Sequence, residues 1–280
     1  MIQYLYLGRV DYAEALRLQA EIAGLVAEGR AGNVLLLLEH PPVLTLGRNA
    51  NRANILASSP PPARRSVTIH EINRGGDVTY HGPGQLVGYP IFDLRTLHNP
   101  NGGRLGPVDF VRLMEEALIR LCGIHGVPAG RIPGLTGVWC GLDSPQVSSK
   151  GLPPAGRKIA AIGIHVARGI TSHGFAFNVT TNLADFTLIV PCGIPDHPVT
   201  SLDKEVENPA GLPPLEPLAH LTARLFGQVF AQPVLAVESL TALRAHAAAT
   251  PPKFPAEDTP LTVPAEVERL RHAPEPPTRA

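Results

Sequence analysis

The spacing of proline constrains the fold of this chain more than any other feature of its sequence. The chain has 30 prolines and 27 glycines among 280 residues. Because proline lacks a backbone N–H and its ring clashes with the preceding helical turn, this density excludes one long helical bundle. Prolines grouped at 41–42 and 60–62 mark loops between short elements. A further cluster between Pro251 and Pro277 predicts a loosely docked or disordered tail.

The rest of the pattern predicts more strands than helices. Short apolar or alternating runs predict strands over residues 2–7, 34–38, 43–46, 67–69, 78–80, 86–92, 137–140, 159–166 and 175–179. Apolar residues at helical spacing predict helices over residues 11–29, 107–124, 214–229 and 239–249. The run 34–38 is typical of a strand buried on both faces, and 43–46 is expected to resume it. The mixed order predicts an α+β (mixed α/β) fold, with a mixed sheet flanked by helices.

Charge and cysteine content exclude several classes of protein. Basic and acidic side chains number 24 each, so the formal net charge is zero, which argues against a dedicated nucleic-acid binder. Cys122, Cys140 and Cys192 include no C-x-x-C pair, so a disulfide framework or a zinc site fits poorly. The amino terminus lacks a signal sequence, and the longest apolar run is too short to cross a bilayer. We therefore expect a cytoplasmic protein that binds neither nucleic acid nor membrane.

The segment from Arg74 to Gln85, RGGDVTYHGPGQ, is the densest cluster of residues suited to a binding site. Its four glycines let the backbone approach a ligand closely, and exposed N–H groups can hold a carbonyl or an oxyanion. The segment matches neither the G-x4-G-K-[ST] phosphate loop nor G-x-G-x-x-G. A plain hairpin with an Asx-type turn is the alternative.

The cysteines lie in different sequence contexts. Cys122 falls in an apolar helical stripe and Cys140 at a strand end, so both are expected to be structural. Cys192 lies between Pro191 and Gly193. A turn of this kind leaves the sulfur reachable with a backbone N–H nearby, as an acyl-accepting nucleophile requires. A structural turn cysteine is the alternative.

Lys158 differs from the other lysines because it opens a predicted strand, which would hold its side chain in place. A positioned ammonium near Cys192 would favour the thiolate form of the thiol. The alternative is an ordinary strand-edge lysine.

Histidines are the remaining candidates for a site. The spacings of His81, His165, His173 and His197 match no zinc signature, so no metal site is expected. His173 precedes Gly174 just before a predicted strand, so it could line a pocket or lie in a solvated turn.

Several separated segments together resemble the lipoyl (octanoyl) transferase family. They are residues 74–85, 157–163 (RKIAAIG), 173–178 (HGFAFN) and 191–193 (PCG), with 38–42 (LEHPP) and 45–47 (TLG) fitting as well. Their order and spacing agree across roughly residues 5–225. The resemblance implies a single biotin/lipoate-ligase-like catalytic domain over residues 1–230, followed by a proline-rich, partly disordered extension over 231–280. That extension and the long loop at 141–156 depart from the usual family pattern.

The resemblance also implies an activity and its partners. A fatty-acyl group, usually octanoyl, would pass from the phosphopantetheine of acyl carrier protein to a lysine on a carrier domain. No ATP, metal or other cofactor is implied. The implied acceptors are the lipoyl domains of 2-oxoacid dehydrogenase E2 subunits and the glycine cleavage H protein. We expect the protein to act as a monomer.

The resemblance assigns roles residue by residue. The family's nucleophile falls on Cys192 and its partner lysine on Lys158. Lys158 would promote the thiolate, and in its neutral form would later act as the base for the incoming lysine. The implied acyl-pocket residues are Arg74, Gly75, Gly76, Asp77, Val78, Thr79, Tyr80, His81, Ala161, Ile162, Gly163, Gly174, Phe175 and Ala176.

An acidic carrier protein as donor calls for a local basic face despite the zero net charge. The candidates are Arg64, Arg65, Arg131, Arg157 and Arg168. Strand alternation predicts that Arg157 points away from Lys158.

Three other functions are alternatives to octanoyl transfer. An ATP-dependent lipoate or biotin ligase would need a basic glycine loop of the Gly-Arg-Gly-Arg type, which is absent from the sequence. Retention of both Cys192 and Lys158 speaks against a non-catalytic acyl-binding relative. A cysteine hydrolase would need a separate His–Asn or His–Asp pair, and none stands out in the sequence.

Overall fold

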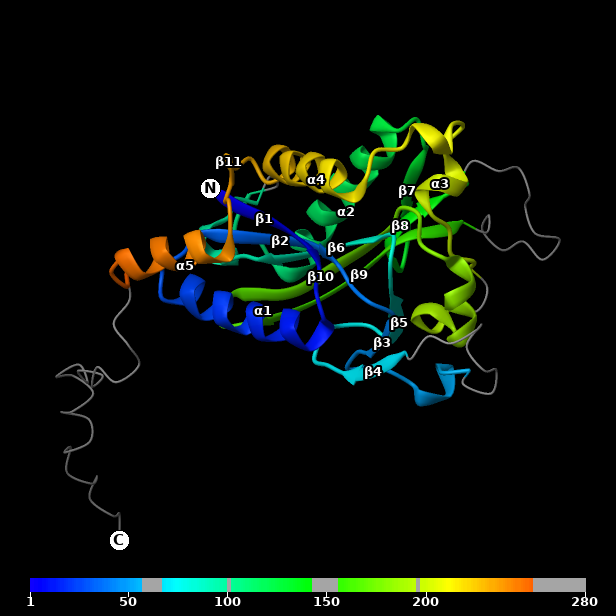
Figure 1. Cartoon of the computed structure of the whole chain (residues 1–280), viewed down its shortest axis with the longest axis horizontal. Coiled ribbons are helices and arrows are strands. Elements are labelled where there is room, and N and C mark those ends of the chain that lie inside the picture. The colour runs from blue at the N-terminus through cyan, green and yellow to red at the C-terminus, as the bar shows by residue number, and fades with distance from the viewer. Residues whose placement is uncertain (57–66, 100–101, 143–155, 195–196, 254–280) are drawn as a thin grey trace, which may run out of the picture.

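A mixed sheet forms the centre of the molecule. The computed structural model describes residues 1–56, 67–99, 102–142, 156–194 and 197–253. Within these residues, the larger sheet has eight strands in the order β11-β1-β2-β6-β10-β9-β8-β7 (Figure 1). Their bounds are β1 (Ile2–Arg9), β2 (Asn33–Glu39), β6 (Gln85–Ile91), β7 (Ala129–Ile132), β8 (Leu135–Cys140), β9 (Arg157–Ala167), β10 (Ile170–Asn178) and β11 (Val234–Ala236). β1 pairs in parallel with β2 and β11 and the other pairs are antiparallel, which confirms the expected mixed sheet.

A smaller sheet lies beside one end of the larger one. It consists of β3 (Val43–Leu46) between β4 (Thr68–Glu71) and β5 (Val78–His81). The prediction that residues 43–46 resume the preceding strand is therefore wrong, because these residues form a strand of the smaller sheet. The prolines at 41–42 cannot donate ladder hydrogen bonds, and after them the chain enters the second sheet.

Helices cover both faces of the larger sheet. α1 (Tyr12–Ala27) and α5 (Leu240–Ala249) pack on one face, and α2 (Pro107–Ile124) and α4 (Leu215–Val229) pack on the other (Figure 1). Asp11 caps α1 by accepting hydrogen bonds from the N–H groups of Ala13 and Glu14. The remaining short helices are Arg52–Asn54, Leu94–Thr96, Leu183–Leu188, Pro191–Gly193, α3 (Leu202–Glu205) and Pro209–Gly211.

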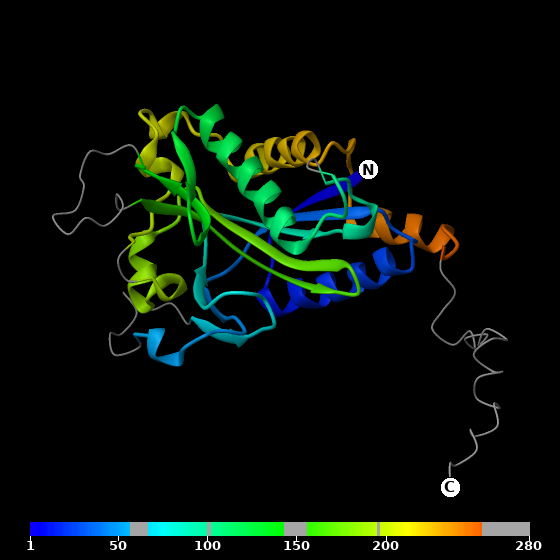
Figure 2. The same cartoon turned by 180° about the vertical axis from the view of Figure 1, so that it is seen from behind.

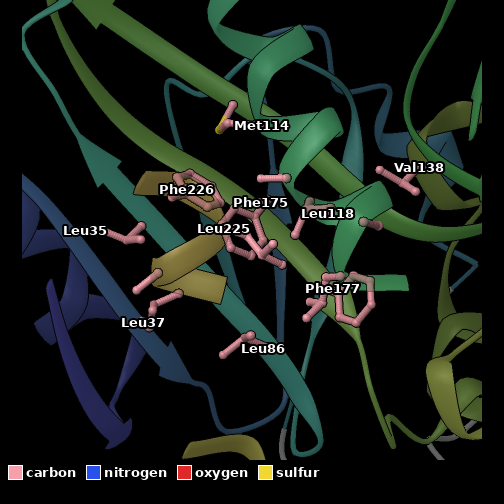
Figure 3. Close-up of a cluster of buried hydrophobic side chains, with 14 of the residues drawn as sticks. Leu35, Leu37, Leu86, Met114, Leu118, Val138, Phe175, Phe177, Leu225 and Phe226 are labelled. Carbon is pink, nitrogen blue, oxygen red and sulfur yellow. The ribbon is translucent and has the colours of Figure 1, made fainter. Parts of the chain in front are cut away.

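The apolar run in β2 serves both layers of the core. Leu35 and Leu37 pack with α2 and α4, in the cluster shown in Figure 3, whereas Leu36 and Leu38 pack under α1. All of these leucines are 0% exposed. The prediction of a strand buried on both faces is confirmed.

The carboxyl-terminal part of the described chain is packed on the domain. β11 extends the sheet beside β1, and the Ile2 N–H donates to Pro233 O at 2.8 Å. Leu243 of α5 is 1% exposed and belongs to the core under α1. Packed structure therefore continues beyond residue 230 through α5, and the division of the chain at that residue stays a prediction. Residues 254–280 lie outside the described chain.

The long hairpin β9–β10 runs across the molecule (Figure 2), and its turn lies beside the segment after β6, where the Leu94 N–H donates to Gly169 O at 2.9 Å. β7 and β11 were not predicted from the sequence. Most of the predicted exposed loop at 141–156 lies outside the described residues. No helix in the described part of the chain is long and apolar enough to cross a membrane.

Candidate functional site

One pocket gathers most of the residues singled out from the sequence. It lies where β5, the β9–β10 hairpin and the turn at Cys192 meet, and its cavity has a volume of about 190 Å³. Pockets for drug-sized ligands typically measure about 300–1,000 Å³, so this cavity suits a narrower group. Its predicted lining residues are Arg74, Gly75, Gly76, Asp77, Thr79, His81, Lys158, Ala161, Ile162, Gly163, Gly174, Phe175, Ala176 and Cys192.

Cys192 occupies a turn with an unusual backbone conformation. Its φ of 57° and ψ of 17° place a non-glycine residue in the left-handed region. The side chain is partly exposed and lines the pocket, whereas Cys122 and Cys140 are 0% exposed in the core. The expected division into one reachable and two structural cysteines agrees with this geometry.

The carboxylate of Asp77 lies close to the Cys192 turn and is held by hydrogen bonds. Asp77 Oδ1 accepts hydrogen bonds from the N–H groups of Asn51 and Val78, and Oδ2 accepts from Asn54 Nδ2. A Cβ placed on Gly193 would lie 2.5 Å from Asp77 Oδ2. Asp77 therefore leaves room only for glycine beside the cysteine, and its carboxylate is occupied in holding the protein together.

Lys158 is buried at the opposite wall, with 6% of its surface exposed. Its backbone is fixed on both sides, because its N–H donates to Pro198 O at 2.8 Å and its carbonyl accepts from Thr200 N at 2.9 Å. The ammonium lies 4.6 Å from the centroid of the Trp139 ring. Lys158 and Cys192 line the same cavity although 34 residues separate them. The structure thus brings the predicted pair together.

The glycine-rich segment crosses β9 at close range. The Gly75 N–H donates to Ile164 O at 2.9 Å, so it is not free to bind an oxyanion. A Cβ on Gly163 would lie 2.6 Å from Gly75 O, which explains glycine at that strand position. The close crossing makes this segment one wall of the pocket.

Arg74 places a buried cation in the same wall. Its guanidinium donates to Thr45 O at 2.8 Å and to Gly75 O at 3.0 Å, and the residue is 8% exposed. Burial lowers the pKa of Arg74 below its ordinary value, and the nearby Cys192 and Asp77 act in the opposite direction. Arg74 and Cys192 line the same cavity.

His81 belongs to a buried cluster of neutral groups at the inner end of the pocket. Its Nδ1–H donates to Gln85 Oε1 at 2.8 Å, and burial lowers the pKa of His81 to about 3. His40 donates from Nδ1 to Val10 O and accepts from the Tyr89 hydroxyl, and burial lowers its pKa to about 4. At neutral pH these imidazoles carry no charge.

Val78 and Tyr80 do not line the pocket, so these two predicted contacts are corrected. Along β5 successive side chains point to opposite faces. Thr79 and His81 face the cavity, while Val78 and Tyr80 enter a separate apolar cluster. The Tyr80 hydroxyl donates to Asp185 at 2.7 Å.

Several lining residues were not predicted. They are Tyr12, Tyr89, Gly134, Leu135, Thr136 and Ile194. His173 also lines the pocket, which was one of the two alternatives given for it. Tyr12 and Tyr89 come from α1 and β6, and nothing in their local sequence indicates a pocket. Gly134 lies in the β7–β8 turn, and Leu135 and Thr136 begin β8 ahead of the strand predicted from residue 137.

Two of the five candidate basic residues, Arg131 and Arg157, are paired with glutamates. Arg131 bonds to Glu115 and Glu116, and Arg157 makes two hydrogen bonds to Glu205. Arg64 and Arg65 lie outside the described residues. The basic face stays a prediction.

No group of three or more His, Cys, Asp or Glu side chains is arranged to hold a metal ion within the described ranges. The expectation of a metal-free, cofactor-free protein stays a prediction.

Solved structures place this architecture in the class of lipoate–protein ligase folds. Lipoate-protein ligase A bound with ATP matches with a TM-score of 0.59 and 14% identity, over 89% of this chain and 93% of that one. A bi-partite lipoate protein ligase from Thermoplasma acidophilum matches with a TM-score of 0.59 and 14% identity, over 89% and 91%. At this identity the likeness establishes the fold alone.

Closer relatives define the family. Residues 11–215 match the lipoyl protein ligase A/B catalytic domain. An octanoyltransferase of Acidobacterium capsulatum is 57% identical over 85% of this chain and 94% of its own length. An octanoyltransferase of Koribacter versatilis is 49% identical over 96% of this chain and 97% of its own length. The chain belongs to the octanoyltransferase family within the lipoyl protein ligase A/B catalytic fold, which confirms the family and the fold expected from the sequence.

Proposed function

We propose that this protein transfers an octanoyl group from acyl carrier protein to a lysine of a lipoate-dependent carrier domain, through a thioester on Cys192. The observation that carries the proposal is the shared cavity of Cys192 and Lys158, walled by the glycine-rich segment. The names of the relatives support octanoyl as the acyl group. The acceptors proposed are the lipoyl domains of 2-oxoacid dehydrogenase E2 subunits and the glycine cleavage H protein.

In the first half-reaction the Cys192 thiolate attacks the thioester carbonyl of the octanoyl carrier protein. The new S–C bond forms on Cys192, the bond to the phosphopantetheine sulfur breaks, and the carrier leaves as a thiol after taking a proton from the Lys158 ammonium, which becomes neutral. The ammonium of Lys158 and the guanidinium of Arg74 favour the thiolate by their positive charge. The product is an octanoyl thioester on the enzyme.

In the second half-reaction the ε-amino group of the acceptor lysine attacks that thioester. An amide bond forms, the S–C bond to Cys192 breaks, and the attacking nitrogen loses a proton. Neutral Lys158 is the proposed base because it lines the same cavity as Cys192. The cycle needs no ATP, since the thioester already carries the free energy for amide formation.

The cavity lining accounts for an acyl substrate. Ile162, Phe175 and Ala176 contribute apolar surface near Cys192. Each buried methylene contributes about 0.8 kcal/mol of binding free energy, so a fixed pocket depth selects chain length by a few carbons. His81 lines the same cavity and, because burial lowers its pKa to about 3, carries no charge there at neutral pH.

A transfer assay without ATP tests this function against the ligase alternative. The protein is mixed with octanoyl carrier protein and a purified lipoyl domain, and the mass of the lipoyl domain is followed. We expect an octanoyl gain of mass on the lipoyl domain from the carrier substrate alone. Transfer that requires free octanoate and ATP would instead identify a ligase.

A further inference from the structure

Lys158 lies in a corner that no acidic residue occupies. Within the described residues, its ammonium forms no salt bridge, although the residue is only 6% exposed. The nearest partner is the face of the Trp139 ring, with 4.6 Å between Nζ and the ring centroid. Trp139 and Lys158 are cross-strand partners in β8 and β9, so the sheet itself holds them together.

The floor of this corner is shaped for the lysine side chain. Gly137 has a φ of 129°, and a Cβ there would lie 3.2 Å from Lys158 Cε and 2.6 Å from Ala160 O. The Gly137 N–H donates to Glu115 Oε1 at 3.0 Å, and Glu115 is 0% exposed. A side chain at residue 137 would displace the lysine from the ring.

Tryptophan at position 139 lowers the stability of the fold, so its presence calls for a role of the ring. It is fully buried, and its Nε1–H has no hydrogen-bond partner in the described part of the chain. A buried polar N–H without a partner lowers stability. The indole N–H therefore does not explain tryptophan at this position, whereas the electron-rich face does.

We propose that Trp139 is a positioning residue that holds the Lys158 ammonium by a cation–π interaction beside Cys192. The inference rests on the proposed function, in which Lys158 assists that thiol. A carboxylate would also hold the ammonium, but its negative charge would cancel the field of the lysine at the sulfur. An aromatic face holds a cation with no countercharge. The lysine thus keeps its full positive charge for the Cys192 thiolate.

The other titratable groups near this corner are few. Glu115 lies beneath Gly137 and is neutralised by Arg112 and Arg131. His197 packs edge-on against the Trp139 ring, with centroids 5.1 Å apart. Cys192 and the Arg74 guanidinium line the same cavity as Lys158.

The chain offers an unusually specific test, because Trp139 is its single tryptophan. Fluorinated tryptophans incorporated during expression lower the π-electron density of this one ring with little change in its size. Alkylation by iodoacetamide reports the thiolate of Cys192, since Cys122 and Cys140 are 0% exposed. The rate constant is measured across pH in the folded protein, with near-UV circular dichroism as the check on packing.

We expect alkylation at neutral pH to slow stepwise with the number of fluorines, by roughly two- to fivefold in total, and its pH midpoint to rise. In a Lys158→Met background the same fluorination should have no effect, because the cation is gone. Trp139→Phe should retain more of the rate than Trp139→Leu. Equal slowing in both backgrounds, or no slowing in the wild type, would overturn the proposal.

This experiment separates the inference from the proposed function. Alkylation requires neither carrier protein nor acyl group. A lysine-dependent fluorine effect without any octanoyl transfer would leave the inference standing and reject the proposed function. Octanoyl transfer without a fluorine effect would support the proposed function and reject the inference.

Discussion

At the scale of single residues, the Cys192 turn holds a backbone conformation that is unfavourable for any side chain with a Cβ. Conformations of this kind cost on the order of 1–3 kcal/mol and persist only where their surroundings impose them. Here the turn is closed by hydrogen bonds from the Gly193 N–H to Val190 O at 3.0 Å and from the Ile194 N–H to Pro191 O at 3.0 Å. The turn places Cys192 in the lining of the cavity that Lys158 and Arg74 also line.

Replacing Lys158 tests the electrostatic part of this arrangement. In Lys158→Ala we expect acylation of Cys192 to slow at least tenfold at neutral pH and its pH–rate profile to move to higher pH, because the thiolate loses a nearby positive charge. The measurement is single-turnover acylation by octanoyl carrier protein from pH 6 to 10. Lys204→Ala, at an exposed position, is the matched control. A slower reaction with an unmoved profile would contradict the assigned role.

The buried histidines predict a loss of stability in acid. The pKa of His81 is about 3 in the folded protein and about 6.5 in an unfolded chain. Between these values only the unfolded chain takes up the proton. The free energy of unfolding therefore has its full value above about pH 6.5. Below that pH, the free energy of unfolding decreases by about 1.4 kcal/mol per pH unit for each such histidine.

Urea unfolding of His81→Asn at pH 7.5 and 5.5 checks this prediction. The asparagine amide can still donate to Gln85, and the acid sensitivity should decrease by about 1.4 kcal/mol between the two pH values. His246→Asn, on the exposed side of α5, should behave like the wild type. An unchanged difference in His81→Asn would refute the explanation.

Sequence reasoning predicted the chemistry of the site better than its shape. Cys192 and Lys158 stand out by residue type and local context. Tyr12 does not, because it reaches the pocket only through the packing of α1 on the sheet. The assignment of Val78 and Tyr80 failed because a contiguous motif was carried over whole, while a strand sends alternate side chains to opposite faces.

At the scale of secondary-structure elements, the ends of α2 agree with the prediction because glycine precedes Pro107 and the apolar stripe stops at Ile124. β11 was missed because a three-residue strand has no periodicity to detect. The small sheet of β3, β4 and β5 was also missed. Pairing between segments distant in sequence depends on tertiary contacts that a local pattern does not encode.

The docking of α5 predicts a stability effect far from the pocket. Leu243→Ala should lower the free energy of unfolding by about 2–5 kcal/mol, because a 1%-exposed side chain leaves a cavity in the core. Leu235→Ala, at a 48%-exposed position in β11, should cost well under 1 kcal/mol. Urea denaturation measures both. Equal small effects would contradict the docking of α5 on the core.

At the scale of the whole molecule, the charge is balanced, so attraction to an acidic donor must come from a local face. Arg131 and Arg157 already pair with glutamates, and this pairing reduces their contribution to such a face. Their reversal would also leave Glu115 and Glu205 without partners. Substitution of these arginines is thus a poor probe of docking.

Ionic strength is the better probe. Screening shortens the reach of surface charge to about 10 Å at 0.1 M salt and about 3 Å at 1 M. The KM for octanoyl carrier protein should rise several-fold between about 0.05 and 0.5 M NaCl, while the KM for a short octanoyl thioester stays constant. Steady-state kinetics with both substrates measures this, and parallel behaviour would remove the basic face from the account.

The central claim is that Cys192 carries the octanoyl group between donor and acceptor. Intact-protein and peptide mass spectrometry after mixing with octanoyl carrier protein, without ATP or acceptor, tests it most directly. We predict an octanoyl mass gain on the peptide containing Cys192, removed by hydroxylamine, absent in Cys192→Ser under those conditions and present in Cys140→Ala. An acyl group that stays on the carrier protein, or that appears undiminished in Cys192→Ser, would contradict the account.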